Sequence, residues 1–508
     1  MAKYREQHRR AQEAHQQMEQ RIEESCRRTG HGRPVTRREF LGRGLIAGTS
    51  TVLLPSVGMM VNRAHAECEI SEAVAGGPYG AGKVPFLAID QGGGANIAGS
   101  NIMVGGAGGQ TDFLTDDAYQ TLGLPPAISP NSVGVNTEFG LAMHPNSAML
   151  RGMLDKTTAA TRANVNGTVI PARSENDTGN NPHNPMYGIA RAGANGEFVV
   201  STGTRNSESG GRSRAPDYMI SAELGPTRVS NRNEAVGLSG GEADGFPSGS
   251  VATATQILAQ LKLGAITEAE ATEELIQCGY DKSLATFNSP ILPSDLDPEA
   301  DADLLSIFPN GEINNDGDFR KAAATMKVIV NGYGGVGTME YGGRDYHQDP
   351  RPETDGKDFK VGQVIGASLE YARLRNQPLM LYVFSDGAVV ADTNNPEDDG
   401  NGTTKFRWRS DNSQRAASAI LVYSPNNAAA AIMRNGAASQ QLGAYNKDNG
   451  TIDTNSSPYA NSVVSLAEVV VLNYLALHGE AGNFGAALGN PVLGANPGME
   501  HIAFNQIT

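Results

Sequence analysis

Two segments of the chain combine residue types that could hold a metal ion. In the stretch 342–349, Asp345 and His347 stand two residues apart, so an extended loop would turn both side chains to the same side. A carboxylate and an imidazole arranged in this way can bind one metal ion. The apolar run 379–384 ends at Ser385 and Asp386, which a buried strand would deliver to its carboxyl end. Either segment alone is a weak signal, because Asp is also common in turns.

A third acidic residue strengthens this interpretation. Asp90 follows the apolar run 84–89 and precedes the glycine-rich turn 92–96. Open α/β sheets bind their ligands at the carboxyl ends of the strands. Together, Asp90, Asp345 with His347, and Asp386 predict a one- or two-metal hydrolytic site at one edge of a sheet.

Imidazole groups are scarce in the rest of the chain. After residue 66 the histidines are His144, His183, His347, His478 and His501. His478 ends an apolar helix, where a cation interacts favourably with the helix dipole. We expect His144, His478 and His501 to have structural roles.

These residues need a scaffold of alternating strands and helices. Strand-like apolar runs occur at 84–89, 198–201, 327–330, 379–384 and 419–423. Helical periodicity occurs at 147–158, 186–193, 253–263, 268–278, 319–326, 361–375 and 463–477. This order predicts an α/β fold with a doubly wound, mostly parallel sheet covered on both faces. Residues 225–317 lack convincing core strands, and we interpret them as a cap or subdomain inserted into one domain, 84–508.

The composition is that of a loop-rich globular protein. The 508 residues include 61 Gly, about 12% against a usual level of about 7%, and only 19% are charged. The net charge is +6 for residues 1–66 and −21 for the remainder. Such an acidic surface makes nucleic acid an unsuitable partner and divalent cations suitable ones.

The basic start has the pattern of an export signal. Arg37 and Arg38 precede Glu39-Phe40-Leu41, a mildly apolar run at 45–61, and small residues at Ala64 and Ala66. The pattern predicts a twin-arginine signal over 1–66, a flexible linker over 67–83, the twin-arginine (Tat) translocon as a partner, and a periplasmic or secreted protein. The alternative is a membrane-spanning helix, for which this interrupted run is short.

Two cysteines would remain after export. Cys68 and Cys278 could form one disulfide in an oxidising compartment. Two unpaired thiols are the alternative, since Cys68 would lie only two residues into the mature chain.

The sequence also resembles a group of exported proteins of unknown function that are related to sulfatases, within the alkaline phosphatase superfamily. The resemblance extends, with gaps, over most of 84–480. It is carried by the first strand with its glycine turn and by the segments 141–145, 173–177, 181–185, 343–347 and 384–386. It implies metal-binding roles for Asp90, Asp345, His347 and Asp386, with calcium, magnesium or zinc as the divalent metal. It also implies a hydroxyl nucleophile near the start of a helix.

Thr178 is the candidate for that nucleophile, because it stands beside Asp177 ahead of a predicted helix. The polar residues around it would equally suit an Asx turn and a helix N-cap.

The chain departs from the family pattern at two places. Asn96 stands where the glycine turn of the family often has Asp, and Asp411-Asn412 stands where the family has a late Asp-His pair. An Asn carbonyl oxygen suits calcium or magnesium better than zinc.

Two functions follow. The first is an exported metal-dependent hydrolase of phosphate or sulfate esters, with a small or polymeric substrate. The second is a secreted binding or structural protein on the same fold, stabilised by divalent cations and without catalysis. The oligomeric state is left open by the sequence.

Overall fold

The computed structural model describes residues 83–174, 181–204, 214–221, 224–239 and 292–508. All of them belong to one compact unit of the chain, Met59–Thr508. The predicted export signal, nearly all of the predicted linker, Thr178, Cys68, Cys278 and the predicted helices at 253–263 and 268–278 lie outside the described residues.

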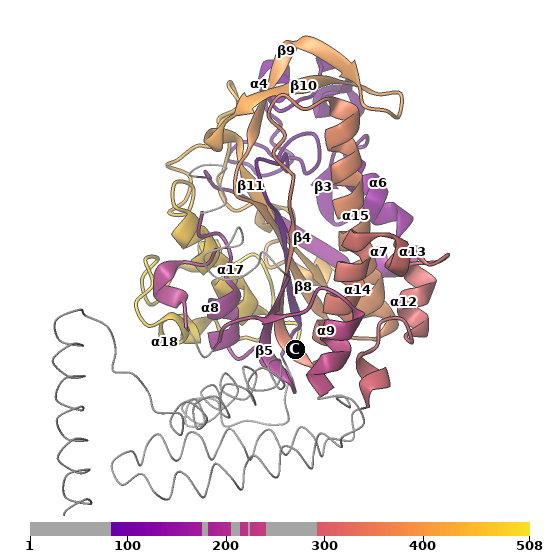
Figure 1. Cartoon of the computed structure of the whole chain (residues 1–508). Helices are drawn as coiled ribbons and strands as arrows, with labels where there is room; N and C mark the ends of the chain where they lie inside the picture. The colour runs from indigo at the N-terminus through magenta and orange to yellow at the C-terminus, as the bar shows by residue number, and fades with distance from the viewer. Residues whose placement is uncertain (1–82, 175–180, 205–213, 222–223, 240–291) are drawn as a thin grey trace, which may run out of the picture. The chain divides into compact units, whose positions relative to one another are not determined.

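The centre of this unit is a seven-stranded sheet in the order β4-β11-β8-β1-β7-β5-β6 (Figure 1). The central strand β1 (Phe86–Gln91) pairs in parallel with β7 (Gly334–Tyr341) and β8 (Leu379–Ser385). On one side, β5 (Val199–Gly203) and β6 (Thr227–Arg228) continue the parallel arrangement. On the other, β11 (Ala417–Tyr423) runs antiparallel to both β8 and β4 (Val165–Pro171). The predicted α/β class with a mostly parallel sheet is therefore confirmed, and the arrangement is compatible with a doubly wound fold.

Each face of the sheet buries its own hydrophobic core, because alternate residues of a strand point to opposite faces. Leu87 and Ile89 face a core covered by α6 (Ala148–Asp155), α14 (Gly317–Val330) and α15 (Arg351–Leu374). Phe86 and Ala88 face a second core covered by α8 (Met186–Arg191), α17 (Val463–Leu477) and α18 (Phe484–Leu488). Figure 1 shows the two helix groups on either side of the strands.

Smaller elements complete the described part of the chain. A two-stranded ribbon, β9 (Val389–Asp398) and β10 (Thr404–Asp411), extends beyond the sheet at the top of Figure 1. The remaining elements are α4 (Asp116–Thr121), α5 (Pro130–Val133), β2 (Asn136–Phe139), β3 (Leu141–Met143), α7 (Ala159–Arg162), α9 (Arg232–Val236), α12 (Ala302–Ile307), α13 (Glu312–Asn315) and α16 (Ala429–Ile432). Among the described residues, no helix combines the length and apolar character needed to cross a membrane.

One predicted strand is wrong. Residues 327–330 continue helix α14 to Val330 and do not form a strand. The run Lys327-Val328-Ile329-Val330 has the β-branched residues typical of a strand, but the helix begins at the N-cap Asp316 and buries these side chains against the sheet. Packing against the sheet therefore outweighs the preference of these residues for a strand.

Strand β7, one of the two neighbours of β1, was not predicted from the sequence. Strand β7 contains Gly334, Gly335 and Gly337, so it lacks the β-branched run typical of a strand. A Cβ atom at Gly337 would lie 2.7 Å from Leu87 Cδ2 and 2.8 Å from Ile329 Cγ1. The glycine lets α14 pack closely on the sheet, which is a tertiary requirement.

The two described ends of the stretch 225–317 join the main fold. Strand β6 lies at the edge of the sheet, and Leu304, Phe308 and Ile313 belong to the same core as α14 and α15. The middle of the predicted insertion lies outside the described residues.

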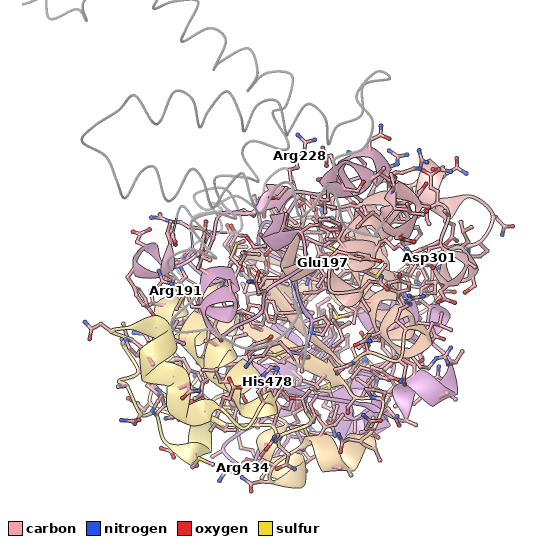
Figure 2. All side chains as sticks on the ribbon, turned by 90° about the horizontal axis from the view of Figure 1, so that it is seen from below. Arg191, Glu197, Arg228, Asp301, Arg434 and His478 are labelled. Atoms are coloured by element: carbon pink, nitrogen blue, oxygen red, sulfur yellow. The ribbon has the colours of Figure 1, made fainter. Side chains whose placement is uncertain are left out.

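His478 is the C-cap residue of α17 and is labelled in Figure 2. Its Nε2 accepts a hydrogen bond from Val84 N at 2.9 Å, and its Nδ1 donates to Tyr474 O at 2.8 Å. Burial lowers the pKa of His478 to about 4, so the ring is neutral at pH 7. Its role is structural as predicted, but it does not act as a cation at the helix end.

Candidate metal site at the carboxyl edge of the sheet

The strands that end in polar residues have their carboxyl ends side by side. In the sheet register, Asp90 of β1 lies beside Glu340 of β7 and beside Phe384 of β8. The loops that follow these three strands therefore leave from one edge, which is where parallel sheets place their ligands.

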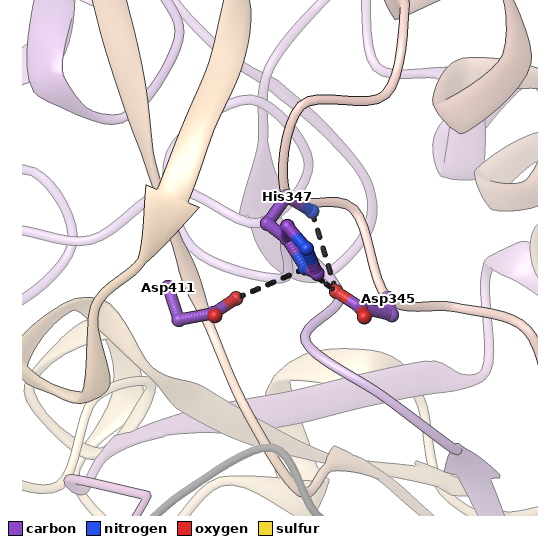
Figure 3. Close-up of side chains that lie close together, drawn as sticks. All are labelled: Asp345, His347 and Asp411. Atoms are coloured by element: carbon purple, nitrogen blue, oxygen red, sulfur yellow. Dashed lines mark hydrogen bonds and ion pairs between the residues drawn. The ribbon is translucent and has the colours of Figure 1, made fainter.

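Three side chains at this edge form a compact group of metal-ligand type. Asp345, His347 and Asp411 each offer one donor atom, and these atoms lie within 4.8 Å of one another. Figure 3 shows the His347 ring between the two carboxylates. Its Nδ1 contacts Asp345 Oδ1 and lies 3.6 Å from Asp411 Oδ1. The exposed fractions of the three side chains are 43%, 43% and 46%, so a ligand could reach them from solvent.

The glycine turn after β1 forms the floor beneath Asp345. Gly92 O accepts a hydrogen bond from Arg344 N at 3.0 Å, and Gly94 O accepts one from Tyr346 N at 3.2 Å. Gly93 has φ +129°, and a Cβ atom there would collide with Asp345 N and would lie 2.9 Å from Asp345 Cα. Only glycine allows the two loops to approach so closely.

Ser385 and Asp386 shape this turn from the neighbouring strand. Asp386 Oδ1 accepts a hydrogen bond from Gly93 N at 2.6 Å. The Ser385 hydroxyl donates to Gly93 O at 2.6 Å and accepts from Ala95 N at 3.0 Å. The strand end 385–386 thus holds the backbone of the turn.

Asp90 lies deeper than the three-residue group. It is fully buried and has the same orientation in the strand as Phe86 and Ala88, which face the core formed by α8 and α17. Glu340, also buried, is its register partner on β7. Of the four ligands predicted from the sequence, the structure brings Asp345 and His347 into one donor group, whereas Asp90 and Asp386 lie at the same edge outside that group.

Asp411 was not among the predicted ligands. It ends β10, and its register partner is Val389, which begins β9 three residues after Asp386. The ribbon leaves the sheet edge and returns to it, so Asp411 comes back to the site. The available signal was the Asp411-Asn412 pair at the position of the late family pair. Asn412 serves another purpose, since its side chain accepts from Gln414 N at 3.1 Å as the N-cap of the short 3-10 helix Ser413–Arg415.

The buried histidines near the sheet are neutral. Burial lowers the pKa of His183 to about 4, and the ring packs edge-on against Phe384 with centroids 5.9 Å apart. Burial likewise lowers the pKa of His144 to about 4. The His144 ring bonds Ile128 O at 2.6 Å, which agrees with the predicted structural role.

The donor chemistry of the three-residue group fits a divalent cation. Two carboxylates and one imidazole suit magnesium, manganese, calcium or zinc. Three protein donors leave coordination positions for water or a substrate oxygen, as catalytic sites require. No protein-family model, curated protein or solved structure matches this chain.

Proposed function

We propose that the chain is an exported, divalent-metal-dependent hydrolase of phosphate or sulfate esters on a fold related to that of alkaline phosphatases and sulfatases. The observation that carries this proposal is the half-exposed group Asp345, His347 and Asp411 at the carboxyl edge of a mostly parallel sheet. Asp345 and His347 are also two of the four residues to which the sequence resemblance assigns metal binding, the others being Asp90 and Asp386.

The roles of the residues follow from their positions. Asp345, His347 and Asp411 would hold the ion, and Ser385 with Asp386 would keep the glycine turn in place beneath them. A bound divalent ion would lower the pKa of a hydroxyl group or water and stabilise charge on the transferred group. Thr178 remains the nucleophile proposed on sequence grounds.

A non-catalytic protein that binds a divalent cation is the second candidate. The donor group contains a single imidazole, Asn412 is engaged as a helix cap, and Asp90 and Asp386 stand outside the group. These features favour one ion over a pair of zinc ions. A single ion could stabilise the fold by binding the native state alone.

Turnover of an aryl phosphate and an aryl sulfate tests the first candidate against the second. The purified protein is treated with EDTA and then supplied with magnesium, manganese, calcium or zinc. Hydrolysis that needs added metal and disappears in Asp345→Ala, His347→Ala and Asp411→Ala supports the hydrolase. Asp448→Ala, an exposed carboxylate remote from the site in sequence, is the matched control. Loss of turnover in Thr178→Ala, with partial activity in Thr178→Ser and metal binding intact, supports Thr178 as nucleophile.

The opposite result identifies a binding protein. If the metal-loaded wild type hydrolyses neither ester while EDTA lowers its melting temperature, the hydrolase proposal is wrong and the cation-binding protein is supported.

Export is proposed from the sequence alone and needs its own test. Changing Arg37 and Arg38 together to Lys should leave unexported precursor, because the twin-arginine translocon reads this pair. Mass spectrometry of the exported protein should show a start at or near Glu67. Normal export of the double variant would refute the proposed route.

A further inference from the structure

Tyr346 stands in the chain between the two proposed ligands but is directed differently. Its side chain is fully buried, whereas those of Asp345 and His347 are half-exposed. The chain turns directly after Tyr346, because Asp349 N donates a hydrogen bond to Tyr346 O at 3.0 Å and His347 N donates one to Asp345 Oδ1 at 3.4 Å. The side chain of Tyr346, which lies between the two ligands in the sequence, is thus the one that packs in the interior.

The ring of Tyr346 is linked to the other two parts of the site through a hydrophobic cluster. It belongs to a small hydrophobic cluster with Ala95, Val389 and Trp408, separate from the two main cores. Ala95 lies in the glycine turn, and Val389 is the register partner of Asp411. This cluster therefore joins the Tyr346 ring to the turn beneath Asp345 and to the ribbon that carries Asp411.

The hydroxyl group of Tyr346 is tied to two helices. It donates a hydrogen bond to Asp358 Oδ1 of α15 at 2.7 Å. Asp358 Oδ2 accepts from Asn101 Nδ2 at 2.7 Å, and Asn101 Oδ1 accepts from Ser147 Oγ, the N-cap of α6, at 2.7 Å. Tyr346, Asp358 and Asn101 are all buried. This chain of bonds links the loop 342–347 to α15 and α6 on one face of the sheet.

We infer that Tyr346 and Asp358 are positioning residues of the metal site, which fix the geometry of Asp345 and His347 without touching the ion. The inference rests on the proposed metal site. Metal affinity depends on the residues that orient the ligands, and loss of such a partner typically lowers it about 10- to 100-fold. Because Tyr346 is anchored in the protein between Asp345 and His347, the side chains of both ligands stay directed toward the ion. The ribbon keeps the Asp411 carboxylate close to them.

A pair of matched variants tests this inference. Tyr346→Phe removes only the hydroxyl group. Tyr341→Phe removes the hydroxyl of another fully buried tyrosine, and this hydroxyl lies 3.5 Å from Asp318 O and 3.7 Å from Met339 Sδ, so its hydrogen bonds are long. Manganese binding is measured by the loss of the free-ion EPR signal, and hydrogen exchange of the amides at 342–349 is measured without metal.

The expected result separates the two variants. Tyr346→Phe should bind manganese about 10- to 100-fold more weakly and exchange faster at 342–349, whereas Tyr341→Phe should remain within about twofold of the wild type in both measurements. Wild-type affinity and exchange in Tyr346→Phe would overturn the positioning role and leave the metal site standing. A wild type that binds no manganese would overturn the metal site itself, and unchanged exchange in Tyr346→Phe would then overturn the anchoring of the loop as well.

Discussion

Asp358 is a carboxyl group enclosed in the protein beneath the proposed site. Burial, reinforced by the nearby Asp355 carboxylate, raises the pKa of Asp358 to about 6. Hydrogen bonds from Asn101 and Tyr346, together with the charge of Arg351, lower that pKa and only partly offset the burial. Keeping this carboxylate ionised at neutral pH therefore lowers the stability of the folded state.

The first prediction concerns the pH dependence of that effect. The folded pKa lies above the unfolded value of 3.8, so the stabilisation is complete below about pH 4 and is lost as pH rises through 6. Relative to Asp358→Asn, the wild type should lose about 2 kcal/mol of unfolding free energy between pH 4.5 and pH 7. Urea unfolding of both proteins in EDTA measures this difference. A difference that stays constant over this range would contradict the assigned pKa.

At the scale of elements, the site is assembled from a glycine turn, a loop and a ribbon. The ribbon β9–β10 is fastened by Lys405, whose ammonium group is fully buried. It contacts Asp355, lies 3.1 Å from Asp399 Oδ2 and donates to Asn146 O at 2.9 Å. One buried cation on β10 thus connects the turn between β9 and β10 to α15.

The second prediction is that this cation is indispensable to the ribbon. Lys405→Met should lower the unfolding free energy by about 3–5 kcal/mol, because it leaves the buried Asp399 without its counter-ion and leaves Asp355 paired with Arg351 alone. Lys447→Met, which removes a half-exposed partner of Asp112, should change it by less than about 1 kcal/mol. Chemical denaturation measures both. Equal effects of the two substitutions would show that the buried network contributes no more than a surface pair.

The third prediction concerns the glycine turn. Gly93→Ala should displace the loop, lower the unfolding free energy by more than about 2 kcal/mol and weaken metal binding at least about tenfold, since its Cβ meets the Asp345 backbone. Gly343→Ala is the control, because φ is +72° there but no atom lies within 4 Å of its Cβ. It should show only the left-handed strain of about 1–2 kcal/mol. Denaturation and manganese titration that fail to separate the two alanines would contradict the close packing.

At the scale of the whole molecule, three buried neutral histidines make the stability of the folded state depend on pH. Burial lowers the pKa values of His144, His183 and His478 to about 4, from 6.5 in the unfolded chain. The unfolded chain therefore binds these protons at a higher pH than the folded protein does. Their stabilisation is present above pH 6.5 and is lost as pH falls toward 4.

The fourth prediction is a decline in overall stability on mild acidification. With three protons from the histidines and one opposing proton at Asp358, the unfolding free energy should fall by about 2 kcal/mol per pH unit near pH 5. Urea unfolding at pH 7, 6 and 5 in EDTA measures it. His478→Gln should remove about one third of the histidine contribution to this slope. A stability that is constant or increases toward pH 5 would exclude neutral buried rings.

What the sequence determined by itself was local. Apolar runs predicted a strand at 84–89, which is observed at Phe86–Gln91, and the helix at 463–477. The spacing of two residues predicted that Asp345 and His347 lie together. The tertiary structure decided the rest. Residues 327–330 are helical because Val328, Ile329 and Val330 pack in the core as part of α14. The glycines of β7 allow that strand to pack closely under the helix. Asp411 lies 64 residues after His347, and only the ribbon returning to the sheet edge brings their donor atoms together. Such contacts depend on chain reversals and packing between distant segments, which no local pattern of residues specifies.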